Sequence, residues 1–214
     1  MTQQLPVPIM KKAVKGITSI AHPLRLRILE YVDVNGPSSV SAITKAVREE
    51  QVIVSQSLRK LRDANLVKTQ RRGIFIYYDL QEEYPASIFV CIRKLYGYMT
   101  DSFYFLQDGY KAILPADYTK MVANQIKLFA NFEKMRILEY LTLNGPCSVT
   151  DLVKGIDSVP LKVSQSLKRL RDDGFVTCHR AGRFQIYEIT KGVHKTAIEC
   201  IHKRYDSLKN KNDF

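Results

Sequence analysis

The sequence predicts a mainly α-helical protein of two similar domains, each of which ends in a small β-hairpin. Residues 25–80 and 134–189 align without a gap at a shift of 109 positions, and 24 of the 56 aligned positions are identical, so the chain contains an internal duplication. Each copy begins with apolar residues at helical spacing and ends in a segment rich in β-branched and aromatic residues. We therefore expect one domain at residues 1–109 and another at residues 110–214.

Three helices are predicted in the first copy. The first, at about residues 22–34, ends at Asn35-Gly36-Pro37, because glycine accepts the left-handed cap conformation and proline cannot continue the helix. Ser39 can cap a short second helix, and the third helix follows residues 48–50. The apolar residues expected to face inward are Leu24, Leu26, Ile28, Leu29, Val32, Val40, Ile43, Val47, Val54, Leu58 and Leu61.

The segment from Leu66 to Leu80 has a different composition. It is rich in Val, Thr, Ile, Phe and Tyr and is interrupted by Arg71-Arg72-Gly73, which indicates a strand, a tight basic turn and a second strand. The first copy therefore has the order helix, short helix, polar-faced helix and hairpin.

The second copy repeats this order. A helix at about residues 130–143 ends at Asn144-Gly145-Pro146, and Ser148 can cap a short helix. Pro160 lies early in the third helix, where its missing N–H costs nothing, and a hairpin follows over residues 175–189 around residues 180–183. The residues expected to face inward are Val149, Leu152, Ile156, Leu161, Val163, Leu167 and Leu170.

Further helices are predicted at about residues 8–19 and 115–129, ahead of the copies, and at about 84–107 and 191–208, behind them. Cys91 and Cys200 occupy equivalent positions, so the trailing helices belong to the repeat. An aromatic run between the copies is expected to form the core that joins the two units, with a small-molecule pocket as the alternative. This run consists of Tyr96, Tyr98, Phe103, Tyr104, Phe105 and Tyr110.

The order of elements is that of a winged helix-turn-helix, and parts of the sequence resemble the ArsR/SmtB-type bacterial and archaeal repressors. Residues 21–29 (AHPLRLRIL) resemble their opening helix, residues 55–67 (SQSLRKLRDANLV) their recognition helix, and residues 71–80 (RRGIFIYYDL) their wing. The second copy is less similar at its start, where residues 130–134 (ANFEK) stand. Since such proteins usually act as homodimers, the resemblance implies tandem winged helix-turn-helix domains that form a single-chain pseudo-dimer.

The polar face of the third helix and the wing can contact double-stranded DNA. Serine can bond a base or a phosphate, glutamine can pair with adenine through two hydrogen bonds, and basic residues further along can meet phosphate or the minor groove. The residues expected to bind DNA are Ser55, Gln56, Arg59, Lys60, Arg71 and Arg72 in the first copy and Ser164, Gln165, Lys168, Arg169, Arg180 and Arg183 in the second.

The two copies differ beside these residues. Gln51-Val52-Ile53 becomes Pro160-Leu161-Lys162, and Arg72 becomes Ala181. We therefore expect an imperfect inverted repeat as the operator, with half-site centres about one helical turn, or roughly 34 Å, apart.

The overall charge also favours nucleic acid as the partner. Thirty-three Lys and Arg residues against 21 Asp and Glu give a net charge of +12, which attracts polyanions. No apolar stretch approaches the roughly 18 residues needed to cross a bilayer, the start of the chain does not resemble a secretion signal, and the dispersed cysteines fit a reducing compartment. A cytoplasmic protein without membrane partners is expected.

Enzymatic chemistry has no support in the sequence. We find no nucleophile elbow, no glycine-rich phosphate loop and no zinc-protease helix, so neither an enzyme nor a cofactor is expected.

Sensing of a metal or a redox signal is weakly supported. Where many similar proteins have a Cys-x-Cys metal site, this chain has Ser39 and Ser41 in one copy and Ser148 and Thr150 in the other, and hydroxyls are poor ligands for thiophilic ions. Other similar proteins use Asp and His on the trailing helices, a set that is incomplete here, so no metal site is expected. Cys91 and Cys200 could form a redox-responsive disulfide, although an inward cysteine is more often a small apolar residue.

The main prediction is a sequence-specific DNA-binding transcriptional regulator, in the role of a repressor. One alternative is a winged-helix protein-interaction or scaffolding module, and another is a non-specific architectural DNA binder. An unidentified small-molecule or redox effector and further dimerisation both stay open.

Overall fold

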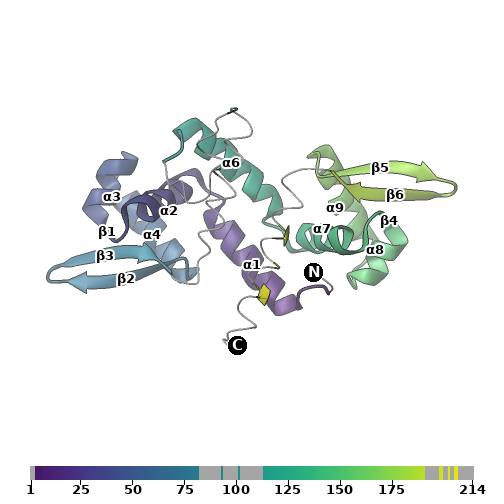
Figure 1. The fold of residues 1–214 in the computed structure, drawn as a ribbon, viewed down its shortest axis with the longest axis horizontal. Coiled ribbons are helices and arrows are strands. Elements are labelled where there is room, and N and C mark those ends of the chain that lie inside the picture. The colour runs from purple at the N-terminus through teal and green to yellow at the C-terminus, as the bar shows by residue number, and fades with distance from the viewer. Residues whose placement is uncertain are drawn as a thin grey trace. The chain divides into compact units, whose positions relative to one another are not determined.

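The structure is a computed structural model that describes residues 3–81, 93, 101, 113–190, 198–199, 202 and 205–206. Two compact units make up the chain (Figure 1), one continuous in sequence and the other built from two separate segments. We call Lys15–Lys127 the copy-one unit and Met1–Val14 together with Leu128–Phe214 the copy-two unit. These units group residues by contact, whereas the predicted domains 1–109 and 110–214 follow the duplication in sequence.

The first copy forms α2 (Pro23–Asn35), β1 (Ser38–Ser39), α3 (Val40–Val47), α4 (Gln51–Asp63), β2 (Val67–Arg72) and β3 (Phe75–Leu80). The second forms α7 (Phe132–Asn144), β4 (Cys147–Ser148), α8 (Val149–Gly155), α9 (Pro160–Asp172), β5 (Val176–Ala181) and β6 (Phe184–Ile189). Ahead of the copies lie α1 (Val7–Ile20) and α6 (Ala116–Phe129). The predicted helices within and ahead of the copies are therefore confirmed, while the predicted trailing helices lie mostly outside the described residues.

The caps that end and begin these helices are those that the sequence predicts. Gly36 has φ 71°, and its N–H donates to the Val32 carbonyl at 2.8 Å, which closes α2. The Ser39 hydroxyl accepts from the Ala42 N–H and starts α3. Gly145 and Ser148 make the equivalent contacts in the second copy, so the same caps separate the first two helices of both copies.

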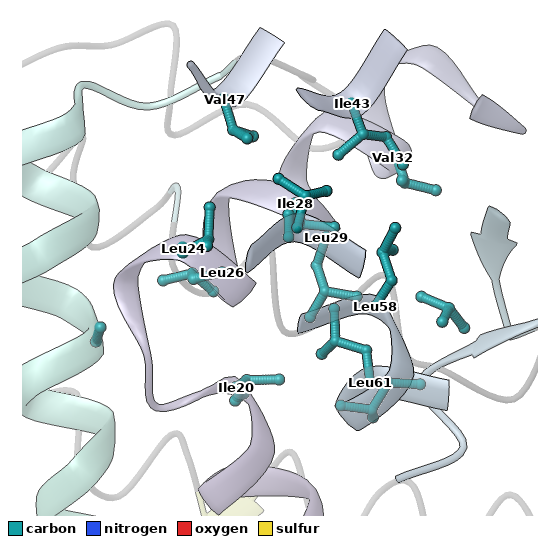
Figure 2. Close-up of a cluster of buried hydrophobic side chains, with 14 of the residues drawn as sticks. Ile20, Leu24, Leu26, Ile28, Leu29, Val32, Ile43, Val47, Leu58 and Leu61 are labelled. Carbon is teal, nitrogen blue, oxygen red and sulfur yellow. The ribbon is translucent and has the colours of Figure 1, made fainter. Parts of the chain in front are cut away.

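The core of the copy-one unit lies between α2, α3 and α4, whose aliphatic side chains converge (Figure 2). Ile28, Leu29, Ile43, Leu58 and Leu61 are fully buried there. The equivalent core of the copy-two unit includes Ile137, Leu138, Leu152, Leu167 and Leu170. The predicted inward faces are confirmed, except that Val40 and Val149 are half-buried and Leu161 is exposed.

Each copy contains a three-stranded antiparallel sheet rather than a hairpin alone. The two-residue strand β1 pairs with β3, giving the order β1-β3-β2, and β4 pairs with β6 in the same way. These strands were not predicted, because two residues are too few to show an alternating pattern. The third strand attaches the wing to the start of α3 or α8.

The turn of the first wing is shorter than predicted. Arg71 and Arg72 are the last residues of β2, and the turn itself consists of Gly73 and Ile74. Gly73 has φ 62° and Gly182 has φ 61°, so each two-residue turn places glycine at the position that needs a positive φ. Both hairpins extend away from the helices of their own unit (Figure 1).

The segment ahead of each copy packs against the other copy. Leu5 is buried in the copy-two unit, where its N–H donates to Glu139 Oε1 at 2.6 Å and its carbonyl accepts from Arg136 Nη1 at 3.0 Å. Leu114, which lies 109 positions after Leu5, is buried in the core of the copy-one unit with α2 residues such as Leu24. Each unit therefore combines one copy with the first part of the leading segment of the other.

Candidate nucleic-acid interface

The third helix of the first copy, α4, is anchored by one face and exposed on the other. Val54, Leu58 and Leu61 are 0% exposed, which fixes the rotation of the helix about its axis. Ser55 and Gln56 therefore project to solvent near the start of α4.

The second copy places the same residue types in the same way. Val163 and Leu167 are 0% exposed and hold α9 against its unit, and Ser164 and Gln165 are exposed beside them. The basic residues predicted for both helices are exposed as well. They are Arg59 and Lys60 on α4 and Lys168 and Arg169 on α9.

Acidic neighbours hold some of these basic groups only weakly. The Arg59 Nε lies 4.0 Å from Asp63 Oδ2, and both side chains are well exposed. Exposed ion pairs of this kind contribute about 0–1 kcal/mol, so a phosphate could replace the carboxylate at little cost.

Both wings carry an arginine that braces the turn. Arg71 Nε donates to the Gly73 carbonyl at 3.1 Å, and Arg180 Nε donates to the Gly182 carbonyl at 3.0 Å. Because only the Nε of each guanidinium is used in these two bonds, the remaining N–H groups can still serve a phosphate.

The wing tips otherwise differ between the copies. The guanidinium of Arg72 donates to Gln70 Oε1 and lies 5.0 Å from the ring centre of Tyr77. Arg183 occupies the turn of the second wing and lies 4.9 Å from the ring centre of Phe184. All four predicted wing arginines are exposed; Arg71 and Arg180 lie at equivalent positions, whereas Arg72 and Arg183 do not.

The prediction did not place exposed aliphatic residues on these helices, and the two most exposed are at equivalent positions. Leu161 was predicted to face inward, which is wrong, because its side chain is 68% exposed; Val52, at the equivalent position, is 65% exposed. Both lie in the first turn, where the inward positions of Val54 and Val163 already complete the apolar stripe. Their spacing of three and four residues from the Ser-Gln pair was the signal that could have placed them on the exposed face.

The hydroxyl residues that stand where similar proteins have a Cys-x-Cys pair lie at the capped starts of α3 and α8. Ser148 and Asp151 form a capping box, in which each side chain accepts from the backbone N–H of the other residue. Ser39 caps α3 and its hydroxyl lies 3.0 Å from that of Ser41. In the part of the chain that the structure describes, no three His, Cys, Asp or Glu side chains gather as a metal site.

The buried acids of the two copies have different partners. Glu139 accepts from the Leu5 N–H, pairs with Arg136 Nη1 at 3.1 Å and lies 2.9 Å from His202 Nε2. In the first copy, Arg93 stands at the position of His202 and pairs with Asp33 at 2.8 Å. His202 is thus buried and bonded to Glu139.

The predicted redox pair cannot be placed, since Cys91 and Cys200 lie outside the described residues, as does the aromatic run. Cys147 is a free thiol whose pKa burial raises to about 11. A thiol of this kind is protonated at neutral pH and reacts slowly.

The fold places this protein in the class of proteins with two winged helix-turn-helix domains in one chain. The family described as "Bacterial regulatory protein, arsR family" matches at residues 22–69 and again at 133–177, once in each copy. The chain belongs to the ArsR family. This match confirms the resemblance in both copies, including the second, whose opening residues diverge.

Several characterised proteins are similar to the chain. The nodulation protein NolR of Rhizobium meliloti is 35% identical over 86 residues, which cover 40% of this chain and 70% of that protein. The biofilm growth-associated repressor of Agrobacterium fabrum is 32% identical over 98 residues, covering 44% and 80%. The HTH-type transcriptional regulator NmtR of Mycobacterium tuberculosis is 38% identical over 72 residues, covering 34% and 59%.

The matched family is one of bacterial regulatory proteins, and two of these relatives are named as a transcriptional regulator and a repressor. The chain is thus a regulator and not an enzyme, as predicted. A DNA-binding regulator is therefore the function class of the chain. Within its described residues, none of the helices has the length and apolarity needed to cross a membrane.

Proposed function

We propose that the chain is a sequence-specific transcriptional repressor that contacts an imperfect inverted repeat with α4 and α9 from a single polypeptide. The observation that carries this proposal is the repeated Ser-Gln pair, which is exposed near the start of both helices by equivalent buried residues. Glutamine at such a position can form two hydrogen bonds with adenine in the major groove.

The basic residues support the proposal in a second way. Arg59, Lys60, Lys168 and Arg169 extend the exposed faces of the two helices, and the wing arginines Arg71, Arg72, Arg180 and Arg183 lie on the hairpins. Phosphate contacts from such groups position a protein on DNA, while the base contacts specify the sequence.

The experiment begins with selection of binding sites from random DNA by the full chain. We expect an inverted repeat whose halves share the bases contacted by Ser-Gln and differ on their flanks, with centres roughly 34 Å apart. Recovery of a perfect inverted repeat would contradict the imperfect operator.

Affinity for the selected site is then measured for Gln56→Ala and Gln165→Ala, with Gln125→Ala as the matched control, since Gln125 is an exposed glutamine on α6. Each of the first two variants should lose about 1–3 kcal/mol of binding free energy on the selected site and almost none on random DNA. Equal losses on both DNAs would point to an architectural binder.

Salt dependence separates the remaining alternatives. A specific regulator keeps a large ratio of selected-site to random-site affinity as salt rises, whereas an architectural binder loses both affinities together. A protein-interaction module would bind neither DNA. Repression is tested with a reporter gene that carries the selected site in its promoter.

A further inference from the structure

The centre of the exposed face on each recognition helix is apolar. With about 100° of rotation per residue, Val52 projects between Ser55, Gln56 and Arg59 and roughly opposite the buried Val54, Leu58 and Leu61. Leu161 takes the same position among Ser164, Gln165 and Lys168.

Neither side chain is needed for the core of its own domain. The apolar stripe of α4 is complete at Val54, Leu58 and Leu61, all of them fully buried, and α9 has the same arrangement. Single exposed aliphatic residues are common on protein surfaces. Here the branched aliphatic character recurs in both copies, whereas the next position changes from Ile53 to Lys162.

We propose that Val52 and Leu161 contact the 5-methyl group of a thymine in each half-site and so contribute to the choice of sequence. This inference rests on the proposed function. The thymine methyl is the apolar group that the base edges of A·T pairs present in the major groove. An aliphatic side chain one turn before the glutamine lies where it can bury that methyl while Gln56 or Gln165 bonds a neighbouring base.

The experiment removes the methyl group from the DNA and the side chain from the protein, separately and together. Each thymine of the selected operator is replaced in turn by deoxyuridine, which lacks only the 5-methyl. Affinities are measured for the wild type, Val52→Ala, Leu161→Ala and the matched control Ile53→Ala, whose side chain is also exposed in the first turn of α4.

We expect one thymine in each half-site at which deoxyuridine weakens wild-type binding by about fourfold, the effect of burying one methyl-sized group. At the thymine of the first half-site, the replacement should have no effect on Val52→Ala and should keep its full effect on Ile53→Ala. Leu161→Ala should show the same loss of coupling in the other half-site. Val52→Thr, which keeps one methyl group, should restore part of the fourfold effect.

Equal effects of deoxyuridine on the wild type and on both alanine variants would overturn the methyl contact. The wild type on unmodified DNA tests the proposed function separately. If it does not prefer the selected site over random DNA, both proposals fail. If it keeps that preference without any coupling to a methyl group, this inference alone fails. A Val52→Ala variant that changes oligomeric state and not DNA affinity would also overturn it.

Discussion

At the scale of single residues, the most informative difference between the copies is the surroundings of one buried glutamate. Glu139 is held by the Leu5 N–H, Arg136 and His202. Its equivalent Glu30 is equally buried, and burial raises the pKa of its carboxyl to about 7, against the opposing effects of the Leu114 backbone and Arg93. A duplicated residue has thus acquired a different electrostatic role in each copy.

The pKa of Glu30 predicts a pH-dependent stability. Because the folded protein holds this proton more tightly than the unfolded chain does, the contribution of Glu30 to stability is full below pH about 4.5 and is lost as pH rises through about 7. Glu30→Gln removes this dependence. Between pH 5 and pH 8, the stability of the wild type relative to Glu30→Gln should fall by roughly 2–3 kcal/mol in urea unfolding.

Glu49→Gln serves as the control for this measurement, because Glu49 is exposed. Its stability should follow that of the wild type at every pH. Parallel curves for Glu30→Gln and the wild type would show that Glu30 titrates normally.

The sequence could predict that the candidate DNA-binding residues are exposed, but it did not predict the orientation of every residue on the same helices. Helical spacing placed Ser55, Gln56 and their equivalents on exposed faces, as found. The inward prediction for Leu161 was wrong because it followed the apolar character of the residue and not its spacing. At three and four residues before Ser164 and Gln165, Leu161 lies on their exposed side of α9.

At the scale of elements, the helices and wings were predictable because their caps and turns are local. Gly36 and Gly73 act through their backbone geometry and Ser39 through its hydroxyl, each within a few residues. The packing of the leading segments was not predictable, since periodicity reports that Leu5 and Leu114 are apolar but not which copy buries them. The short strands β1 and β4 were missed for lack of a pattern.

Glycine substitutions in two elements should have opposite effects. Gly16→Ala, inside α1, meets open space and should raise stability by about 0.5–1 kcal/mol because alanine favours a helix. Gly73→Ala also meets open space but has φ 62°, so it should lower stability by about 1–2 kcal/mol. Thermal unfolding of both variants checks the signs, and a stabilising Gly73→Ala would contradict the turn geometry.

The exchange of leading segments predicts which copy a mutation destabilises. Leu5→Ala should cost about 2–5 kcal/mol and speed hydrogen exchange in α7, within the copy-two unit, although Leu5 precedes the first copy. Leu114→Ala should instead affect α2. The adjacent Ile113→Ala is the control for the second variant, because Ile113 is half exposed. Faster exchange in α2 after Leu5→Ala would refute the exchange of segments.

At the scale of the whole molecule, the exchange of leading segments makes the stability of each copy depend on residues from the other. A fragment of residues 1–109 contains Leu5 but not Glu139, and a fragment of residues 110–214 contains Leu114 but not the core that buries it. Such a dependence resembles that of a domain-exchanged dimer joined into one chain.

Mixing these fragments should therefore restore stability that neither fragment has alone. We expect the melting temperature of the equimolar mixture, followed by circular dichroism, to exceed that of either fragment and to rise with concentration. The Leu5→Ala fragment should gain less in the same mixture. A mixture that melts as the simple sum of its parts would show that each half is self-sufficient.

The difference between the wing tips affects how the two orientations of the protein on DNA can be distinguished. A homodimer on a palindrome looks the same from either end, but here Ile74, 86% exposed, occupies the tip of one wing where Arg183 occupies the other. On the proposed operator the chain would have a distinct left and right side. Reversing the site relative to a neighbouring promoter would then present a different protein surface to RNA polymerase, so the polarity of the site itself could carry regulatory information.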